Sequence, residues 1–123
     1  MKILVVDDSK VMRMLVRRAL RQAGYGEAEI TEASDGEEAY KEAIADKFDL
    51  VMSDWNMPNL NGLGLLKNLR ADGFRTPFVF VTTECTPEMR QQADEAGADK
   101  FIVKPFGADD VRFALEPLVG VAA

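Results

Sequence analysis

Short apolar runs alternate with longer amphipathic stretches along the whole chain, and this pattern predicts five strands, each followed by a helix. The short runs are rich in β-branched and aromatic residues, as strands are, and the stretches between them repeat apolar residues at helical spacing. We predict strands at residues 3–6, 29–33, 50–53, 78–81 and 101–103. We predict helices at residues 11–23, 36–45 and 62–70, another that begins at 86–87, and a last one at 108–118.

Several predicted helix ends carry recognisable capping residues. Thr86 followed by Pro87 is a typical helix start, with a hydroxyl at the N-cap and proline at the first helical position. Ser34 and Glu37 have the spacing of a capping box for the second helix. Helix C-termini favour a left-handed residue, and two glycines fall where we expect such ends, Gly24 and Gly97.

Strands that alternate with helices of this length predict a parallel sheet covered by helices on both faces, because right-handed crossovers return each helix to the sheet. The chain has 123 residues, the size of one ordinary domain. We therefore expect a single α/β domain of five β-α units, in which every motif shares one core.

Polar residues follow four of the predicted strands. In an open α/β sheet, ligands bind outside the carboxyl ends of the strands, so these side chains should converge at one rim. They are Asp7, Asp8, Asp54, Thr82 and Lys104. Three carboxylates at close range repel one another unless their pKa values rise or a cation binds. Mg²⁺ prefers oxygen ligands and commonly takes one or two carboxylates plus a phosphate, so the cluster predicts a magnesium site beside a phosphate site.

Each of these residues also has a simpler interpretation when it is taken alone. A single aspartate at a strand end is most often a solvated loop residue, and a single Thr82 or Lys104 is most often ordinary surface. The predicted convergence is what favours the site. Asp109 and Asp110 give the contrast, because they open the last helix, where negative charge stabilises the positive end of the helix dipole.

Composition and charge exclude several classes of function. The net charge of −6 argues against phosphate-backbone binding, so nucleic acid is not an expected partner. The chain has no histidine, which removes His-based triads and means that any phosphohistidine donor is another protein. The apolar run at residues 3–6 is too short for a signal peptide or membrane span, so we expect a cytoplasmic protein. The one cysteine, Cys85, is assigned no function.

The same residues resemble the motifs of a known family. Asp7-Asp8, the run Ser53-Asp54-Trp55-Asn56-Met57-Pro58, Val81-Thr82 and Lys104-Pro105-Phe106 together resemble the response-regulator receiver domain, over essentially residues 1–123 and in the family's order. The similarity is greatest to single-domain chemotaxis members. It implies a flavodoxin-like (βα)5 fold with strand order 2-1-3-4-5 and a phospho-accepting role in two-component signalling.

The resemblance also implies roles for individual residues. Asp54 would be the phosphoryl acceptor, Mg²⁺ would be held by Asp8, Asp54 and the backbone carbonyl of Asn56 with Asp7 nearby, and Lys104 would pair with the phosphoryl oxygens. Thr82 would bond the new phosphoryl group and let the aromatic residue at the start of strand five, here Phe101, swing inward. Pro105 would follow a cis peptide bond.

Three positions depart from the family's common pattern. Phe101 replaces a frequent tyrosine, so a switch that needs a phenol hydroxyl is not available, although an apolar ring can still rotate. Thr83 stands where a smaller residue is common, and its bulk is expected to narrow access to Asp54. Asn61 before Gly62 replaces a frequent aspartate and suits an equivalent turn.

The expected partners are a sensor histidine kinase or phosphotransfer protein as donor, and a target protein docking on helix four, strand five and helix five. We expect a monomer without membrane contact, and a signalling domain with slow self-dephosphorylation rather than an enzyme. Two alternatives stay open: a receiver belonging to a longer regulator, and an aspartyl-phosphate hydrolase. Asn56 argues against the hydrolase, whose general acid-base aspartate would stand at that position.

The first predicted helix is strongly basic. It carries Lys10, Arg13, Arg17, Arg18 and Arg21. Such a row is either a solvated face or a surface that docks the acidic face of a phosphodonor near Asp54, and the sequence does not separate the two.

Overall fold

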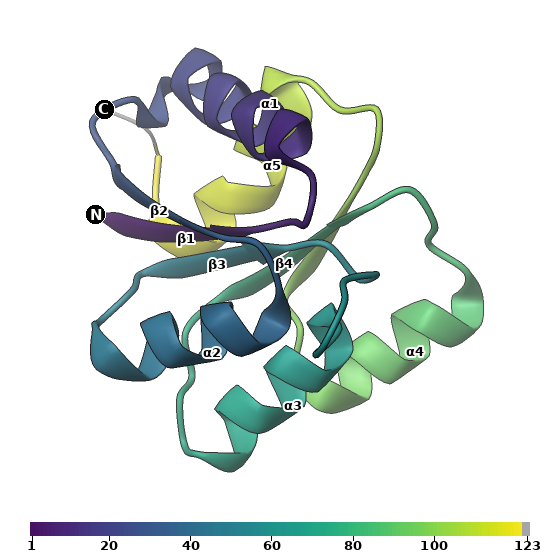
Figure 1. Cartoon of the computed structure of the whole chain (residues 1–123). Coiled ribbons are helices and arrows are strands. Elements are labelled where there is room, and N and C mark those ends of the chain that lie inside the picture. The colour runs from purple at the N-terminus through teal and green to yellow at the C-terminus, as the bar shows by residue number, and fades with distance from the viewer. Residues whose placement is uncertain (122–123) are drawn as a thin grey trace.

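The computed structural model describes residues 1–121, which form one parallel five-stranded sheet in the order β2-β1-β3-β4-β5 (Figure 1). The strands are β1 (Lys2–Val6), β2 (Glu29–Ala33), β3 (Leu50–Ser53), β4 (Phe78–Thr82) and β5 (Lys100–Val103). The helices are α1 (Lys10–Leu20), α2 (Gly36–Ala45), α3 (Gly62–Ala71), α4 (Pro87–Ala96) and α5 (Ala108–Val119), and a short π-helical segment, η1 (Arg21–Tyr25), extends α1. The predicted fold class and strand order are confirmed.

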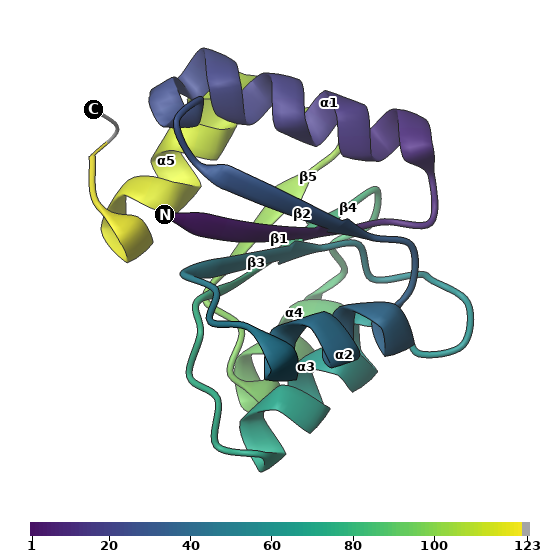
Figure 2. The ribbon, with the colours of Figure 1, turned by 60° about the vertical axis from the view of Figure 1, so that its left-hand side comes forward.

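Helices cover both faces of the sheet, with α1 and α5 on one side and α2, α3 and α4 on the other (Figures 1 and 2). Successive strand residues point to opposite faces, so β1 supplies Ile3 and Val5 to the core beneath α1 and α5, and Leu4 and Val6 to the core on the other side. All four side chains are buried, as expected for a strand in the middle of a parallel sheet.

Side chains cap the first four helices at their N-termini. The Thr86 hydroxyl accepts a hydrogen bond from the Met89 backbone N–H at 3.1 Å, as predicted. Asn61 caps α3 through its Oδ1, which accepts from the Gly64 N–H at 2.8 Å. Gly24 and Gly97 have φ values of 99° and 98°, which confirms the expected left-handed residues.

The predicted capping box between Ser34 and Glu37 is wrong. Asp35 is the N-cap of α2, and its carboxylate accepts from the Glu38 backbone N–H at 2.8 Å. The Ser34 hydroxyl donates instead to the Glu38 carboxylate at 2.9 Å. A carboxylate at the N-cap satisfies the free helical N–H with a charge-assisted bond, so Asp35 takes the position from its neighbour.

The carboxyl ends of β1, β3, β4 and β5 reach one rim of the sheet, which is where the candidate site lies. The loop after β3 packs closely against the start of α3. A Cβ added at Gly62 would lie 2.2 Å from the Asp54 carbonyl oxygen and 2.9 Å from the Phe80 ring. Only glycine fits this close approach.

Within the described residues, no helix is both long and apolar enough to cross a membrane.

We predict that Gly62→Ala lowers the free energy of unfolding by about 1–3 kcal/mol or more, because the added methyl group meets backbone that cannot move aside easily. Gly26→Ala is the matched control, since its Cβ would make only an ordinary 3.4 Å contact and its φ of −65° suits alanine. That variant should be unchanged or up to about 1 kcal/mol more stable. Urea unfolding measures both, and equal effects would refute the close approach.

Candidate functional site

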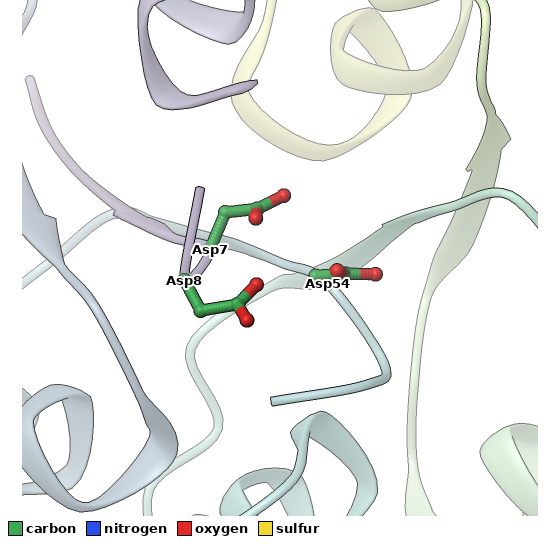
Figure 3. Close-up of side chains that lie close together, drawn as sticks. All are labelled: Asp7, Asp8 and Asp54. Atoms are coloured by element: carbon green, nitrogen blue, oxygen red, sulfur yellow. The ribbon is translucent and has the colours of Figure 1, made fainter. Parts of the chain in front are cut away.

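The three predicted aspartates lie together at the carboxyl ends of β1 and β3 (Figure 3). Asp7 and Asp8 follow β1, and Asp54 follows β3, its neighbour in the sheet. One carboxylate oxygen from each lies within 4.8 Å of the others. Asp7 is buried, Asp54 is partly buried and Asp8 is exposed, so the cluster opens to solvent on one side.

Lys104, which follows β5, reaches into this cluster. Its Nζ lies 3.0 Å from Asp7 Oδ2 and 3.6 Å from Asp54 Oδ2, and its side chain is only 11% exposed. The ammonium group thus pairs with two of the three carboxylates, and their negative charge exceeds its single positive charge. Mg²⁺ prefers oxygen ligands in a negatively charged site that stays partly open to solvent, so these residues fit that ion.

The Asp54 carboxyl group has an environment that opposes its ionisation. Burial raises its pKa most, and the charge of Asp7 raises it further. The ammonium of Lys104 and a 2.8 Å hydrogen bond from the Trp55 backbone N–H act in the opposite direction and lower the pKa. The net shift is upward, because loss of hydration outweighs the attraction of the lysine.

Thr82 closes β4 at the same rim and presents an unusual polar atom. Its side chain is fully buried, and its hydroxyl oxygen has no hydrogen-bond partner among residues 1–121. A buried polar group without a partner costs about 1–3 kcal/mol, so natural proteins keep few of them. Thr82 is therefore available to bond a group that enters the site.

Phe101 lies next to the site in a cluster of aromatic rings. Its ring centroid is 5.2 Å from that of Phe80 and 6.2 Å from that of Trp55. The Arg90 guanidinium on α4 lies 5.3 Å from the Phe101 ring centroid. This cation–π contact joins α4 to β5 and was not predicted, since nothing in the local sequence around Arg90 indicates it.

The structure divides the basic residues of the first helix into two groups. Arg13 and Arg17 both form ion pairs with Glu32 on β2, at 2.8 and 3.2 Å. Lys10, Arg18 and Arg21 are exposed. The contact of Arg13 with Glu32 could not be predicted from the sequence, because Glu32 stands 19 residues away on an edge strand.

The residues around the site include several others with predicted features. The Lys104–Pro105 peptide bond is cis, as predicted. Asp109 and Asp110 lie in the first turn of α5, as predicted, and the Asp110 carboxylate also accepts from the Gly107 backbone N–H at 2.8 Å. Asn56 and Thr83 are exposed, and their roles as carbonyl ligand and access filter remain predictions.

Comparison with known proteins supports the family resemblance. Residues 3–116 match the family model of the response regulator receiver domain, so the chain belongs to that family. The chemotaxis protein CheY-3 of Vibrio cholerae is 40% identical over 120 residues, which cover 96% of this chain and 91% of that protein. The chemotaxis protein CheY1 of Helicobacter pylori is 40% identical over 123 residues, which cover 98% of each.

Solved structures agree with this assignment. Vibrio cholerae CheY4 superposes with a TM-score of 0.85 at 37% identity, covering 96% of this chain and 98% of that one. The receiver domain of the Francisella response regulator 1452 gives a TM-score of 0.84 at 30% identity, covering 95% and 94% of the two chains. The chain is a phosphoacceptor signalling domain of the receiver family.

The raised pKa of Asp54 predicts that its ionisation lowers the stability of the fold in a pH-dependent way. A carboxyl group with a higher pKa in the folded state than in the unfolded state binds its proton more tightly when folded. Folding stability therefore falls as pH rises through the window between the two pKa values, and the cost is complete above it. We predict that Asp54→Asn is more stable than wild type at neutral pH without Mg²⁺, and that the difference shrinks as pH falls through that window.

Urea unfolding at a series of pH values measures this difference. Asp94→Asn is the control, because Asp94 is an exposed carboxylate on α4 outside the cluster. An Asp54→Asn variant that is less stable at neutral pH would contradict the account, since it would mean that attraction to Lys104 outweighs burial.

Proposed function

We propose that Asp54 accepts a phosphoryl group from a phosphohistidine of a partner protein, and that the acyl phosphate changes a surface read by a target protein. The observation that carries this proposal is the combination at one rim: three carboxylates within 4.8 Å, a lysine bound to two of them, and a buried hydroxyl with no partner among the described residues. Its parts suit a phosphoryl group together with a cation.

In the proposed reaction, an Asp54 carboxylate oxygen attacks the phosphorus in line with the bond to the donor imidazole. The O–P bond forms as the P–N bond breaks, and the imidazole nitrogen keeps the electron pair and takes up a proton from solvent. Asp54 must be ionised to attack. Once ionised, the partly buried Asp54 carboxylate is less well hydrated than a fully solvated one, and this makes its oxygen a better nucleophile.

Lys104 places a positive charge where the transferred phosphoryl oxygens would lie. Its Nζ lies between Asp7 and Asp54 and is placed to pair with a transferred phosphoryl oxygen. Asp7, Asp8, Asp54 and the carbonyl of Asn56 are the residues proposed to hold Mg²⁺. When bound, this ion neutralises oxygens of the phosphoryl group and offsets the repulsion among the carboxylates.

The proposed switch joins Thr82 to Phe101. A phosphoryl group on Asp54 gives the buried Thr82 hydroxyl the acceptor it lacks, so the phosphorylated protein favours a loop arrangement in which that bond is made. The loop at residues 83–86 leads from Thr82 to α4, and Arg90 of α4 contacts the Phe101 ring. Movement of this loop therefore changes the packing of Phe101 and the face formed by α4, β5 and α5, which we propose docks the target.

The proposed donor surface lies on the other side of the site. An apolar cleft of about 470 Å³ runs between α1 and the loop after β5, with Met12, Leu15 and Phe106 among its lining residues and Lys104 at its site end. Arg18 borders the cleft, and Arg21 is exposed one turn further along. A donor with an apolar ridge and acidic flanks fits this surface and brings its phosphohistidine to Asp54.

Slow turnover follows from Asn56, since this amide cannot transfer a proton as the aspartate of a phosphohydrolase does. We therefore propose a signalling role and not an enzymatic one. The chemotaxis names of the relatives support chemotaxis as the pathway. We also propose that the protein acts as a cytoplasmic monomer.

Trp55 reports on the site directly, because its backbone N–H bonds Asp54 and its ring packs on Phe80. We predict that its fluorescence changes on adding Mg²⁺ and changes again on adding acetyl phosphate with Mg²⁺ present. In Asp54→Ala, the acetyl phosphate response should be lost. A wild-type protein without a Mg²⁺ response would contradict the metal site.

The same titration also tests whether Thr83 restricts access of a small phosphodonor to Asp54. If Mg²⁺ binds and acetyl phosphate gives no response, Thr83→Ala should restore the response, because Thr83 lines the cleft beside Lys104. If the response stays absent in that variant, Asp54 is not accepting phosphate from small donors.

Reversing Arg18 and Arg21 to glutamate tests the donor surface. We predict that phosphotransfer from the cognate phosphohistidine protein slows by about tenfold or more, because charge complementarity sets the encounter rate. Phosphorylation by acetyl phosphate should be unchanged, since these exposed residues do not touch the acidic cluster. Arg112, which is paired with Asp109 on α5, provides the matched reversal control. Equal loss with both donors would mean that the site itself was damaged.

A further inference from the structure

Arg13 joins the backbone of the acidic pair to the edge of the sheet. Its Nη1 donates to the Asp7 carbonyl oxygen at 2.6 Å, and its Nε donates to Glu32 Oε1 at 2.8 Å. Its side chain is only 15% exposed, although it belongs to the basic row of α1. One guanidinium group therefore connects α1, the end of β1 and β2.

The carbonyl that Arg13 binds belongs to the peptide unit linking Asp7 to Asp8. Rotation of that peptide would change the directions of the two carboxylates relative to each other. Other contacts hold parts of this turn: the Asp7 N–H donates to the Ala33 carbonyl at 3.1 Å, and the Ser9 N–H donates to Asp7 Oδ1 at 2.9 Å. Among the bonds formed by residues 1–121, the one from Arg13 restrains this peptide plane from the helix side.

Glu32 fixes Arg13 in turn. Glu32 stands on β2 beside Val5 of β1, and its second carboxylate oxygen accepts from Arg17 at 3.2 Å. Arg13 and Arg17 thus share one carboxylate, but Arg17 has no bond to the Asp7–Asp8 turn among those formed by the described residues. The planar guanidinium can bond both a carboxylate and a carbonyl at fixed geometry, which a lysine ammonium cannot reproduce.

We propose that Arg13 is a positioning residue for the cation site, acting through the Asp7–Asp8 peptide and braced by Glu32. This inference rests on the proposed Mg²⁺ site. The positive charge of Arg13 has the opposite effect on Mg²⁺ binding, because a guanidinium close to the acidic cluster repels a cation. Positioning and charge therefore predict opposite results when Arg13 is removed: weaker Mg²⁺ binding if positioning dominates, and tighter binding if charge dominates.

Titration of Mg²⁺ against Trp55 fluorescence tests the proposal in wild type, Arg13→Ala, Arg13→Lys and Arg17→Ala. We expect Arg13→Ala to weaken Mg²⁺ binding by about tenfold, the lower end of the effect of losing a residue that orients a metal ligand. Arg13→Lys should weaken binding similarly although it keeps the charge. Arg17→Ala, which removes the same charge from the same carboxylate, should bind Mg²⁺ within about twofold of wild type.

Urea unfolding without Mg²⁺ separates positioning from general stability. If the Arg13→Ala protein is less stable but binds Mg²⁺ with wild-type affinity, Arg13 is only structural and the proposal is overturned. Tighter binding in Arg13→Ala would overturn it in favour of charge. If Arg13→Ala does not fold, Arg13→Lys decides by the same criterion. A wild-type protein that shows no Mg²⁺ binding would refute the cation site itself. Normal Mg²⁺ binding in both wild type and Arg13→Ala would refute only the role of Arg13.

Discussion

Repulsion among three carboxylates is the constraint on which the rest of this structure depends. Parallel strands deliver Asp7, Asp8 and Asp54 to one rim, where the Lys104 ammonium pairs with Asp7 and Asp54. The sheet has to hold these groups against their mutual repulsion, and it does so with strands buried on both faces and with tight packing of the loop after β3 on α3. The remaining negative charge is what the proposed cation would offset.

The same rim keeps two further unfavourable features. Asp54 is held where burial opposes its charge, and Thr82 keeps a buried hydroxyl with no partner among the described residues. Neither feature contributes to the stability of the resting fold. In the proposed mechanism, a phosphoryl group and a cation would relieve both features, and the free energy withheld from the resting state would then favour the phosphorylated one. This is the physical link between the fold and a two-state signal.

Much of this could be predicted from the sequence, because the relevant information is local or periodic. Strands such as Leu50–Ser53 are short apolar runs, and the aspartates that end them fall at one rim in any parallel α/β sheet. The strand order came from resemblance to a family. Longer-range contacts could not be predicted: Asp35, the cap of α2 in place of Ser34, also accepts from the Asn59 side chain at 2.8 Å, and Arg13 turns from the surface row to reach Glu32 and the Asp7 carbonyl. Such contacts depend on which side chains the folded chain brings within reach, and spacing in the sequence does not encode them.

The most direct test of the central claim is to locate the phosphoryl group chemically. The protein would be phosphorylated with Mg²⁺ present and then treated with borohydride, which reduces an aspartyl phosphate to homoserine, and the modified residue would be found by peptide mass spectrometry. The account predicts homoserine at position 54 alone, and none when Mg²⁺ is withheld. Homoserine at position 7 or 8, or an unmodified position 54 in a protein that has gained a phosphoryl group, would contradict it.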